Sequence, residues 1–304
     1  MKQTNTSIID RVAEVLEKKS LDYSMINYPN KGEKSIDLIA INKNNNRRIV
    51  LKILTSKKIT KIKQDLQNIA KIGIGVPIMI DDKVEQEVIN DKGNVFEMNI
   101  YTFEKILDGE KAFLYKTRGG MFVKINSKQL KKKREEMGLS LGEVAQALGV
   151  SRISIYEYER EDSYVSIDVA EKLVEIFGED ILGDIFDNFG TYEINTEIKT
   201  FSSLKTSSSS KIIDKLSEKG FRVVNMNFTA IDIIALKGER KIFFSLETQS
   251  PSVSLVKFNE AKKISEKIGS ELIVVAKDSR NKKVYEKEGF NTITENEIVN
   301  YEFD

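Results

Sequence analysis

A short apolar motif occurs twice in the chain and constrains the fold more than any other feature of the sequence. Ile36–Ala40 reads IDLIA, and Ile231–Ala235 reads IDIIA. Each motif follows an amphipathic helical pattern, which includes Ile8–Val12 before the first motif and Ile212–Leu216 before the second. Because self-similarity of this kind marks a repeated structural unit, we expect one unit to occur twice.

The elements that follow the two motifs also correspond. Each motif precedes a polar turn and an apolar strand ending in Thr, Ile49–Thr55 in the first half and Ile242–Thr248 in the second. A helical pattern and a short apolar strand follow, the strand being Val76–Ile80 or Leu272–Ala276. The apolar residues are Ile59, Ile62, Leu66, Ile69 and Ile72 in the helix of the first half, and Leu255, Phe258, Ala261, Ile264 and Ile268 in the helix of the second. Both halves read helix–strand–strand–helix–strand, which predicts two duplicated α/β domains.

The region between the two copies follows a different pattern. Phe113–Thr117 and Met121–Ile125 flank a Gly-Gly turn with β-favouring residues at alternate positions, which predicts a β-hairpin. From Ser127 to about Phe189 the pattern is helical with no strand signal, and Asn195–Ser210 is a polar linker. The predicted domains are an α/β copy at 1–107, a hairpin connector at 108–126, a helical domain at 127–190, a linker at 191–210 and the second copy at 211–304.

The composition removes several classes of chemistry. The 304 residues include no Cys, His or Trp, so disulfides, Cys/His metal sites and Ser-His-Asp or Cys-His nucleophiles are excluded. The net charge is +1, so any attraction to nucleic acid must come from a local patch. No glycine-rich phosphate loop occurs, so we expect no cofactor, and no effector can be named. The absence of a secretion signal, of a membrane-length apolar run and of Cys leads us to expect a cytoplasmic protein.

Each helix predicted in the central region begins at a capping residue. Ser140 precedes one helix and is followed three residues later by Glu143, which makes a capping box. Ser151 and Ser166 are placed to cap the next two helices. Gly149 permits a sharp turn between helices, because glycine adopts a positive φ at little cost. The pattern predicts a compact helix-turn-helix.

The stretch from Gln129 to Phe177 resembles the Cro/C1-type helix-turn-helix domain of repressors over its whole length. The residues that carry the resemblance are Leu130, Arg134, Gly138, Leu139, Ser140, Val144, Ala145, Leu148, Gly149, Val150, Ser151, Arg152, Ile155, Tyr158 and Glu159. The resemblance implies an all-α, five-helix, lambda-repressor-like domain with its motif from Leu139 to Tyr158. The whole chain is also similar to an archaeal family of Cro/C1-type transcriptional regulators, in which this domain follows a hairpin like Thr117–Gly120.

In the Cro/C1 family the second helix of the motif enters the major groove, and by position that helix is Ser151–Arg160. Its N-terminal or outward face carries the candidate DNA contacts Ser151, Arg152, Ser154, Tyr156 and Glu157. Arg152 is the foremost candidate for a contact to a base or a phosphate. Candidate phosphate contacts are Lys128, Lys131, Lys132 and Lys133, the alternative being that this lysine run is only a solvated helix face.

Other residues of the motif are predicted to be structural. Arg134 and Glu159 match positions that pair in this fold, so we expect an ion pair rather than DNA contacts. Ala145 is small where two helices must cross closely, Gly149 makes the turn, and Tyr158 is expected to lie in the core.

Two departures from the family pattern affect the expected DNA contacts. Leu141 stands where Gln usually follows the Ser that opens the first motif helix, and Glu161 stands where Gly usually follows the recognition helix. The segment Lys124–Asp187 carries 9 basic and 14 acidic residues. Six of the basic residues lie between Lys124 and Arg134, so attraction to phosphate must be local.

Both α/β copies resemble the restriction-endonuclease-like PD-(D/E)xK nuclease fold, especially its Holliday-junction-resolvase branch. The resemblance rests on the element order and on Asp37 and Asp232, which match the first acid of the motif. The chemistry of that fold needs a second acid and a Lys near Mg²⁺. The positions of that acid and Lys hold Lys52 and Leu54 in the first copy, and Ser245 and Glu247 in the second. We therefore expect no catalytic and no metal-binding residues, although Asp232, Glu247 and Gln249 leave a relocated site open.

These observations predict a sequence-specific transcriptional regulator that binds double-stranded DNA with its helix-turn-helix, as a homodimer and not as an enzyme. Two alternatives remain. The first is a structure-selective, metal-dependent nuclease guided by the helix-turn-helix. The second is a coactivator or adaptor whose helical domain binds basal transcription proteins, which the acidic balance of that domain favours.

Overall fold

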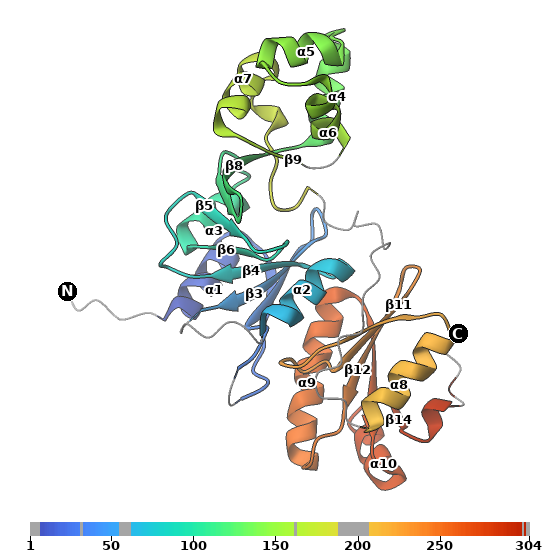
Figure 1. The fold of residues 1–304 in the computed structure, drawn as a ribbon. Helices are drawn as coiled ribbons and strands as arrows, with labels where there is room; N and C mark the ends of the chain where they lie inside the picture. Colours follow the sequence, from blue (N-terminus) through green and yellow to red (C-terminus); the bar gives the residue numbers. More distant parts are fainter. Residues whose placement is uncertain are drawn as a thin grey trace, which may run out of the picture. The chain divides into compact units, whose positions relative to one another are not determined.

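The computed structural model describes residues 7–30, 33–54, 62–160, 163–187, 207–299 and 301 (Figure 1). The chain forms two compact units, neither of which is continuous in the sequence. Unit 1 comprises Met1–Ser20, Ile53–Thr55 and Val76–Tyr192, and unit 2 comprises Leu21–Lys52, Ser56–Gly75 and Glu193–Asp304. No helix among the described residues is long and apolar enough to cross a membrane.

Unit 1 begins with an amphipathic helix and continues into a sheet. Helix α1 (Ile8–Lys18) opens with a capping box between Ser7 and Asp10, which satisfies two backbone N–H groups that would otherwise lack partners. The further elements of this unit outside the helical domain are β4 Val76–Ile80, β5 Val88–Asp91, β6 Phe96–Met98, α3 Ile100–Leu107, β7 Leu114–Thr117 and β8 Gly120–Ile125, and a last strand, β9, is Ser163–Val165. These strands hydrogen-bond in the order β4-β6-β5-β7-β8-β9.

The predicted hairpin is present, as β7 and β8. Tyr115 pairs with Phe122 and Thr117 with Gly120 in antiparallel register. Gly120 has a φ of +135°, which only glycine adopts readily, so the turn depends on it. Because β7 also pairs in parallel with β5, the hairpin extends the sheet and carries the chain from the sheet into the helical domain.

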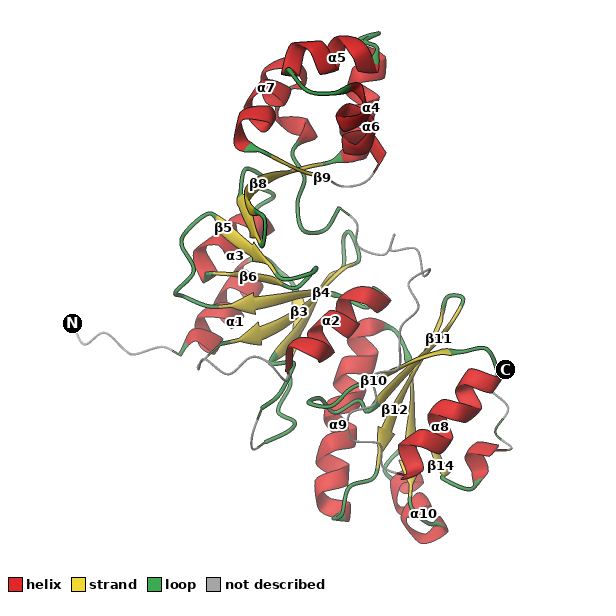
Figure 2. Ribbon diagram, viewed as in Figure 1, coloured by secondary structure: helices red, strands yellow, loops and turns green. Residues whose placement is uncertain are grey.

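The helical domain packs around one core (Figure 2). Its elements are α4 Ser127–Glu136, α5 Leu141–Leu148, α6 Arg152–Arg160, β9 Ser163–Val165, α7 Ile167–Phe177 and the 3-10 turn η1 Glu179–Ile181. The five-helix arrangement is not confirmed, because the described residues form four α-helices and a single 3-10 turn. The core includes Leu130, Val144, Ala145, Leu148, Ile155, Leu173 and Phe177, one or more from each α-helix.

The expectation that this region contains no strand was wrong. Strand β9 pairs antiparallel with β8, with Val165 opposite Val123 and Ser163 opposite Ile125. Three residues are too few to show an alternating pattern, and the strand forms because β8 offers it a free edge. Val165 and Ile125 are both buried in the core of the helical domain, so β9 joins that core to the hairpin.

Unit 2 contains the first strands and the second helix of the first copy together with the whole second copy. The first-copy elements are β1 Asp22–Met25, β2 Leu38–Asn42, β3 Arg47–Ile53 and α2 Ile62–Ile72. The second-copy elements are α8 Ser207–Glu218, β10 Arg222–Asn225, β11 Ile233–Lys237, β12 Arg240–Leu246, α9 Pro251–Ile268, β13 Glu271–Ala276, α10 Ser279–Lys287, β14 Thr292–Thr294 and η2 Glu297–Val299.

The second copy has three layers. Its sheet has the strand order β10-β11-β12-β13-β14, and alternate residues of β13 point to opposite faces. Ile273 and Val275 pack with α8 residues such as Ile212, whereas Val274 packs with Phe258 of α9. In Figure 2 helices α8 and α9 accordingly lie on opposite sides of the yellow strands.

Both copies share strand register around the repeated motif. Leu38 pairs with Leu51 in the first copy as Ile233 pairs with Phe244 in the second. The element order predicted from the sequence omitted the strands β1, β5 and β6 of the first copy and β10 and β14 of the second. Each of these strands is only three or four residues long, which is too short for the clear alternation that reveals a longer strand. The predicted order also omitted helix α3 of the first copy and helix α10 of the second.

The linker prediction was wrong at its C-terminal end. The predicted linker covered 191–210, of which 191–206 lie outside the described residues. Helix α8 begins at Ser207, so the last four serines of the predicted linker form its first turn. The apolar residues that follow, such as Ile212 and Leu216, are buried against the sheet and stabilise the helix beyond what serine propensity alone would predict.

Candidate DNA-binding surface and two altered nuclease-like centres

Helix α6 presents an exposed face at its start. Ser151 precedes the helix, and its Oγ accepts a hydrogen bond from the backbone N–H of Ser154 at 3.0 Å. The Ser154 hydroxyl lies 2.9 Å from the same Oγ, so Ser154 takes part in the cap. Arg152 and Glu157 are exposed, and Tyr156 keeps 52% of its surface accessible. Four of the five predicted contact residues are thus exposed, and Ser154 is half-buried.

The sequence interpretation missed Ile153. This residue of α6 is 73% exposed, the largest value among the exposed large hydrophobic residues of the described chain. It precedes Tyr156 by three positions, so the two side chains are neighbours on the outward face of the helix. Apolar side chains on a recognition helix can contact the methyl group of thymine. The sequence did contain a signal for Ile153: it lies two positions before the buried Ile155, so in a helix the two side chains point to different faces.

The buried side of α6 determines which residues of the helix point outward. Ile155 is fully buried in the domain core, and the half-buried Tyr158 packs against the same core. Helix α5 ends at Gly149, which adopts a left-handed conformation with φ of 70°. The backbone N–H of Val150 bonds to the carbonyl of Ala145 at 3.0 Å and closes the turn. The turn and the core together hold α6 with Arg152 and Tyr156 outward.

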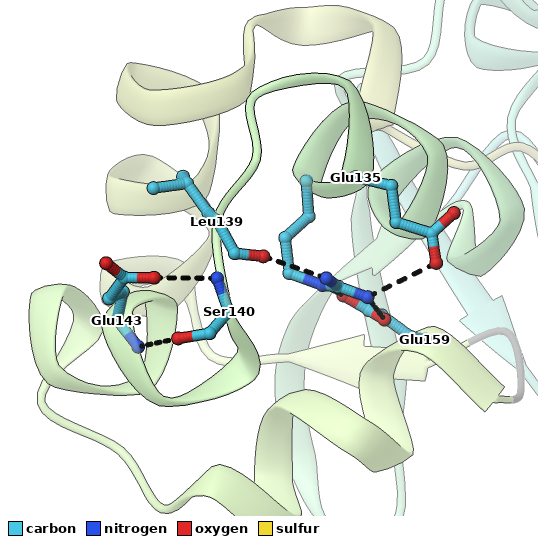
Figure 3. A network of polar contacts seen from close by, with 6 residues as sticks. Glu135, Leu139, Ser140, Glu143 and Glu159 are labelled. Carbon is cyan, nitrogen blue, oxygen red and sulfur yellow. Dashed lines mark hydrogen bonds and ion pairs between the residues drawn. The ribbon is translucent and has the colours of Figure 1, made fainter.

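A polar network ties the first helix of the domain to α6 (Figure 3). Arg134 donates to both carboxylate oxygens of Glu159, from Nε at 2.5 Å and from Nη2 at 2.8 Å. A third bond runs from Nη1 of Arg134 to the carbonyl of Leu139 at 2.9 Å. The side chains of Arg134 and Glu159 are only 12% and 7% exposed. Arg134 thus positions the end of α6 and the loop before α5, and it is not available to DNA.

The capping box at the start of α5 completes this network. The backbone N–H of Ser140 donates to Glu143 at 2.8 Å, and the N–H of Glu143 donates to the Ser140 hydroxyl at 3.2 Å. The bond from the backbone N–H of Ser140 lowers the pKa of Glu143, because it stabilises the charged form of the carboxylate.

The lysine run of α4 does not act as one group. Lys128 and Lys131 are exposed, and Lys132 lies 3.8 Å from Glu136 with 65% of its side chain accessible. Lys133 instead donates to Asp180 of η1 at 2.9 Å, and this bond lowers the pKa of Asp180. Lys128, Lys131 and Lys132 are therefore the lysines of α4 best placed to meet a phosphate.

Charge is unevenly distributed over the helical domain. Helix α4 carries five basic and two acidic residues, whereas α7 and η1 together carry five acidic residues and one basic residue. Helix α4 packs against α6, the helix with the exposed outward face. The acidic excess of the domain therefore does not fall on the pair of helices that carry the candidate DNA contacts.

The nuclease-like centre of the first copy is occupied by lysines. Asp37 is 5% exposed. The Nζ of Lys52, the residue at the position of the missing acid, lies 3.0 Å from Oδ2 of Asp37. The Nζ of Lys34 lies 3.1 Å from Oδ1. Two ammonium groups thus face the carboxylate on which a nuclease of this fold would bind a metal.

In the centre of the second copy a lysine also faces the acid, but it comes from a different element. Lys257, on α9, donates to Oδ2 of Asp232 at 2.5 Å and to the carbonyl of Leu246 at 3.0 Å. The N–H of Leu246 donates to the same carboxylate oxygen at 2.7 Å. Burial raises the pKa of Asp232 and outweighs the opposing effect of Lys257. The sequence interpretation missed Lys257, because nothing in the chain near Asp232 indicates it.

Glu247 is held apart from Asp232. It accepts from the backbone N–H of Lys277 and from the amide of Asn281, both at 2.7 Å. Glu247 and Asp232 both line a cavity of about 410 Å³, which also includes Gln249. In that cavity Lys257 already donates a hydrogen bond to the carboxylate of Asp232. Among the described residues no three His, Cys, Asp or Glu side chains converge as metal ligands. Mg²⁺ therefore does not fit the residues of either centre.

Comparison with known proteins assigns both kinds of domain. Residues 5–112 match the PD-(D/E)XK superfamily domain, and residues 130–182 match a helix-turn-helix of the Cro/C1 type. No solved structure matches the chain. The matches define the class as a DNA-binding, helix-turn-helix protein of transcription regulation with a nuclease-like domain.

Relatives over nearly the whole chain identify the family. A protein of Sulfurisphaera tokodaii is 67% identical over 97% of this chain and 99% of its own length. One of Sulfolobus acidocaldarius is 48% identical over 95% and 96%, and one of Saccharolobus islandicus is 40% identical over 96% and 94%. All three are provisionally named HTH-type transcriptional regulatory proteins. The chain belongs to this archaeal family.

Proposed function

We propose that the protein is a sequence-specific transcriptional regulator that reads the major groove with α6. The observation that carries the proposal is the outward face of that helix, where Arg152, Ile153, Tyr156 and Glu157 are exposed while Ile155 anchors the other side. A long donor, an aromatic ring and an apolar side chain on one exposed helix face suit base edges and thymine methyl groups. Lys128, Lys131 and Lys132 of α4 supply phosphate contacts that set the register.

The regulator acts as a homodimer on double-stranded DNA. The part of each chain that the structure describes contains one helix-turn-helix, and domains of this type recognise half-sites about one helical turn apart when they act in pairs. We keep the predicted division into an α/β copy at 1–107, a hairpin at 108–126, the helical domain at 127–190, a linker and a second copy, with the boundary between the linker and the second copy moved from 211 to the start of α8 at Ser207. The two copies descend from one duplicated unit, which their shared register supports.

The α/β copies serve this regulator without cutting nucleic acid. Lys52 and Lys257 place ammonium groups on Asp37 and Asp232, where a nuclease would hold its metal ion. A cation fixed at that place repels a divalent metal, and Glu247 lies where the catalytic Lys would be needed. The copies act as a scaffold for the DNA-binding domain.

Selection from a pool of random DNA duplexes with the intact protein tests the proposal. We expect enrichment of one two-fold symmetric site with half-sites about one helical turn apart. Recovery of unenriched DNA would contradict sequence-specific reading, and an enriched asymmetric site would contradict the homodimer.

The distribution of charge supports a second candidate function. Five acidic residues on α7 and η1 form a surface suited to a basic protein, as an adaptor of basal transcription would need. The salt dependence of DNA binding separates the two functions. A regulator that contacts phosphates loses affinity steeply as salt rises, whereas an adaptor shows no measurable salt-dependent DNA binding of its own.

A further inference from the structure

A buried carboxylate of the first copy binds the backbone of the second copy within unit 2. Asp65, on α2, is fully buried. Its Oδ1 accepts from the backbone N–H of Asn227 at 3.0 Å, and its Oδ2 accepts from the N–H of Phe228 at 2.8 Å. Ser35 donates its hydroxyl to Asp65 at 2.6 Å and its backbone N–H to the carbonyl of Phe228 at 2.7 Å. Asp65 therefore fastens the loop after β10 to the first copy.

The second copy makes the corresponding contact in the opposite direction. Glu260, on α9, accepts from the backbone N–H of Asn27 at 2.8 Å through its Oε2. Asn27 lies two residues after the end of β1, just as Asn227 lies two residues after the end of β10. In each case a helix carboxylate of one copy binds the same loop of the other copy.

The two carboxylates occupy equivalent positions. Asp65 directly precedes Leu66 and Glu260 directly precedes Ala261, which are the residues that the repeat aligns. All four are buried, and each helix buries a further residue three positions later, Ile69 and Ile264. Helices α2 and α9 therefore present the same face in the same phase, and the reciprocal contacts are related by an exchange of the two copies.

Cations at equivalent positions of the two copies interact with each other. Arg48 of β3 pairs with Ile41, and Lys241 of β12 pairs with Leu236, at matching places in the two copies. Burial and the charge of Arg48 lower the pKa of Lys241, which shows that the two cations are close. Residues next to a two-fold axis meet their own counterparts.

We infer that the two α/β copies pair with each other within one chain as an internal two-fold dimer, joined through α2, α9 and the loops after β1 and β10. This pairing goes beyond the proposed function and does not depend on DNA recognition. The two copies contact each other through the same surface, so the interface is isologous. Both surfaces are used up in this contact, so no further copy can bind to them. The partner that this surface fits is the other copy of the chain itself, so a second chain in a homodimer must bind elsewhere.

Cutting the folded protein tests the pairing. A specific protease site is inserted within 191–206, the intact chain is cleaved, and the mass is measured by light scattering at micromolar concentration. We expect the two fragments to stay together, so that the cut protein keeps the mass that the same chain shows before cleavage. Separation of the wild-type fragments would overturn the inference.

Substitution of the two carboxylates shows which contacts hold the fragments. Asp65→Asn with Glu260→Gln keeps the shapes but replaces one acceptor oxygen of each side chain by an amide nitrogen, which cannot accept from a backbone N–H. We expect the fragments to bind each other at least about tenfold more weakly. Glu97→Gln, which changes an equally buried carboxylate that pairs with Lys92 in unit 1, serves as the control and leaves the affinity unchanged. Equal affinity of the double variant and the wild type would contradict the assigned contacts.

A cross-link distinguishes pairing within a chain from pairing between chains, and it leaves both carboxylates in place. Asp22 of the first copy and Lys267 of the second form an ion pair, and the chain has no native Cys. In the variant with Asp22→Cys and Lys267→Cys, a short bismaleimide is expected to yield cross-linked monomer at any protein concentration. Cross-linked dimer alone, or no cross-link, would overturn the inference, and each single-Cys variant provides the background.

Discussion

Arg152 stands in the first turn of α6 with its side chain exposed, where a long donor reaches a guanine edge or a phosphate. We expect Arg152→Ala to weaken specific binding by about 1–3 kcal/mol and to relax the preference at one base position per half-site. Competition binding against the selected site and its single-base variants measures both effects.

Arg160, an exposed arginine at the other end of α6, provides the control. Arg160→Ala should leave the base preference intact. If Arg152→Ala lowers affinity equally for the selected site and for random DNA, Arg152 contacts only phosphate.

The pair of Asp232 and Lys257 can be tested as an ion pair in its own right. Lys257 is 5% exposed, so Asp232→Asn leaves a buried ammonium group without the carboxylate that balances its charge. We expect Asp232→Asn to destabilise the second copy by about 3 kcal/mol, and Asp232→Asn with Lys257→Met to recover most of that loss. Calorimetric unfolding of the intact chain measures the shift, and additive losses in the double variant would rule out a coupled pair.

At the scale of single elements, the sequence predicted what local chemistry determines. The caps at Ser140 and Ser151, the turn at Gly149 and the hairpin around Gly120 all depend on neighbours within a few residues, and these four are present. The predicted cap at Ser166 is present only in position, because this serine precedes α7 but its side chain makes no capping hydrogen bond. Strand β9 could not be predicted, because it exists only where the edge of β8 receives it.

The same distinction applies to the candidate sites. The spacing of the motif indicated Arg152 and Tyr156, since helical periodicity alone turns them outward. It could not indicate Lys257, which reaches Asp232 only because α9 packs against β12 and β13. Nor could the spacing show that Lys133 differs from the other lysines of α4, because its partner Asp180 comes from the far end of the domain.

Helix α4 as a whole is expected to act on DNA through its charge. Lys131→Gln, Lys132→Gln and Lys133→Gln together should weaken binding to all DNA and reduce the salt slope by about 0.9 for each phosphate that the variant no longer neutralises. Most of this effect should come from Lys131 and Lys132, because Lys133 is paired with Asp180.

Binding titrations at several salt concentrations, with the exposed Lys283 and Lys287 of α10 changed to Gln as a control, measure this slope. A slope that does not change in the triple variant would show that the lysine run is a solvated face.

The crossing of α5 and α6 has little room for a larger residue. Ala145 is 5% exposed and lies in the core with Leu148 and Ile155. We expect Ala145→Leu to destabilise the helical domain by about 1–3 kcal/mol through overpacking, while the α/β copies stay folded. Gln146→Leu, one position along on the exposed face of α5, should have little effect. Thermal unfolding followed by circular dichroism measures the stability of both variants. An unfolding midpoint of Ala145→Leu equal to that of the wild type would show that the helices cross closely at another residue.

For the whole molecule, the two altered centres predict a protein that does not cut nucleic acid. We expect no cleavage of duplex, single-stranded or four-way-junction DNA, or of RNA, with Mg²⁺ or Mn²⁺. Gel assays with the wild type and Asp232→Asn test this prediction. Metal-dependent cleavage by the wild type that disappears in Asp232→Asn would restore the nuclease function.

The two lysines that face the acids of the nuclease-like centres come from different elements. Lys52 reaches Asp37 from strand β3, whereas Lys257 reaches Asp232 from helix α9. In each centre a cation of the chain itself balances the charge of the acid. The fold of either copy is therefore independent of the supply of metal ions from solution.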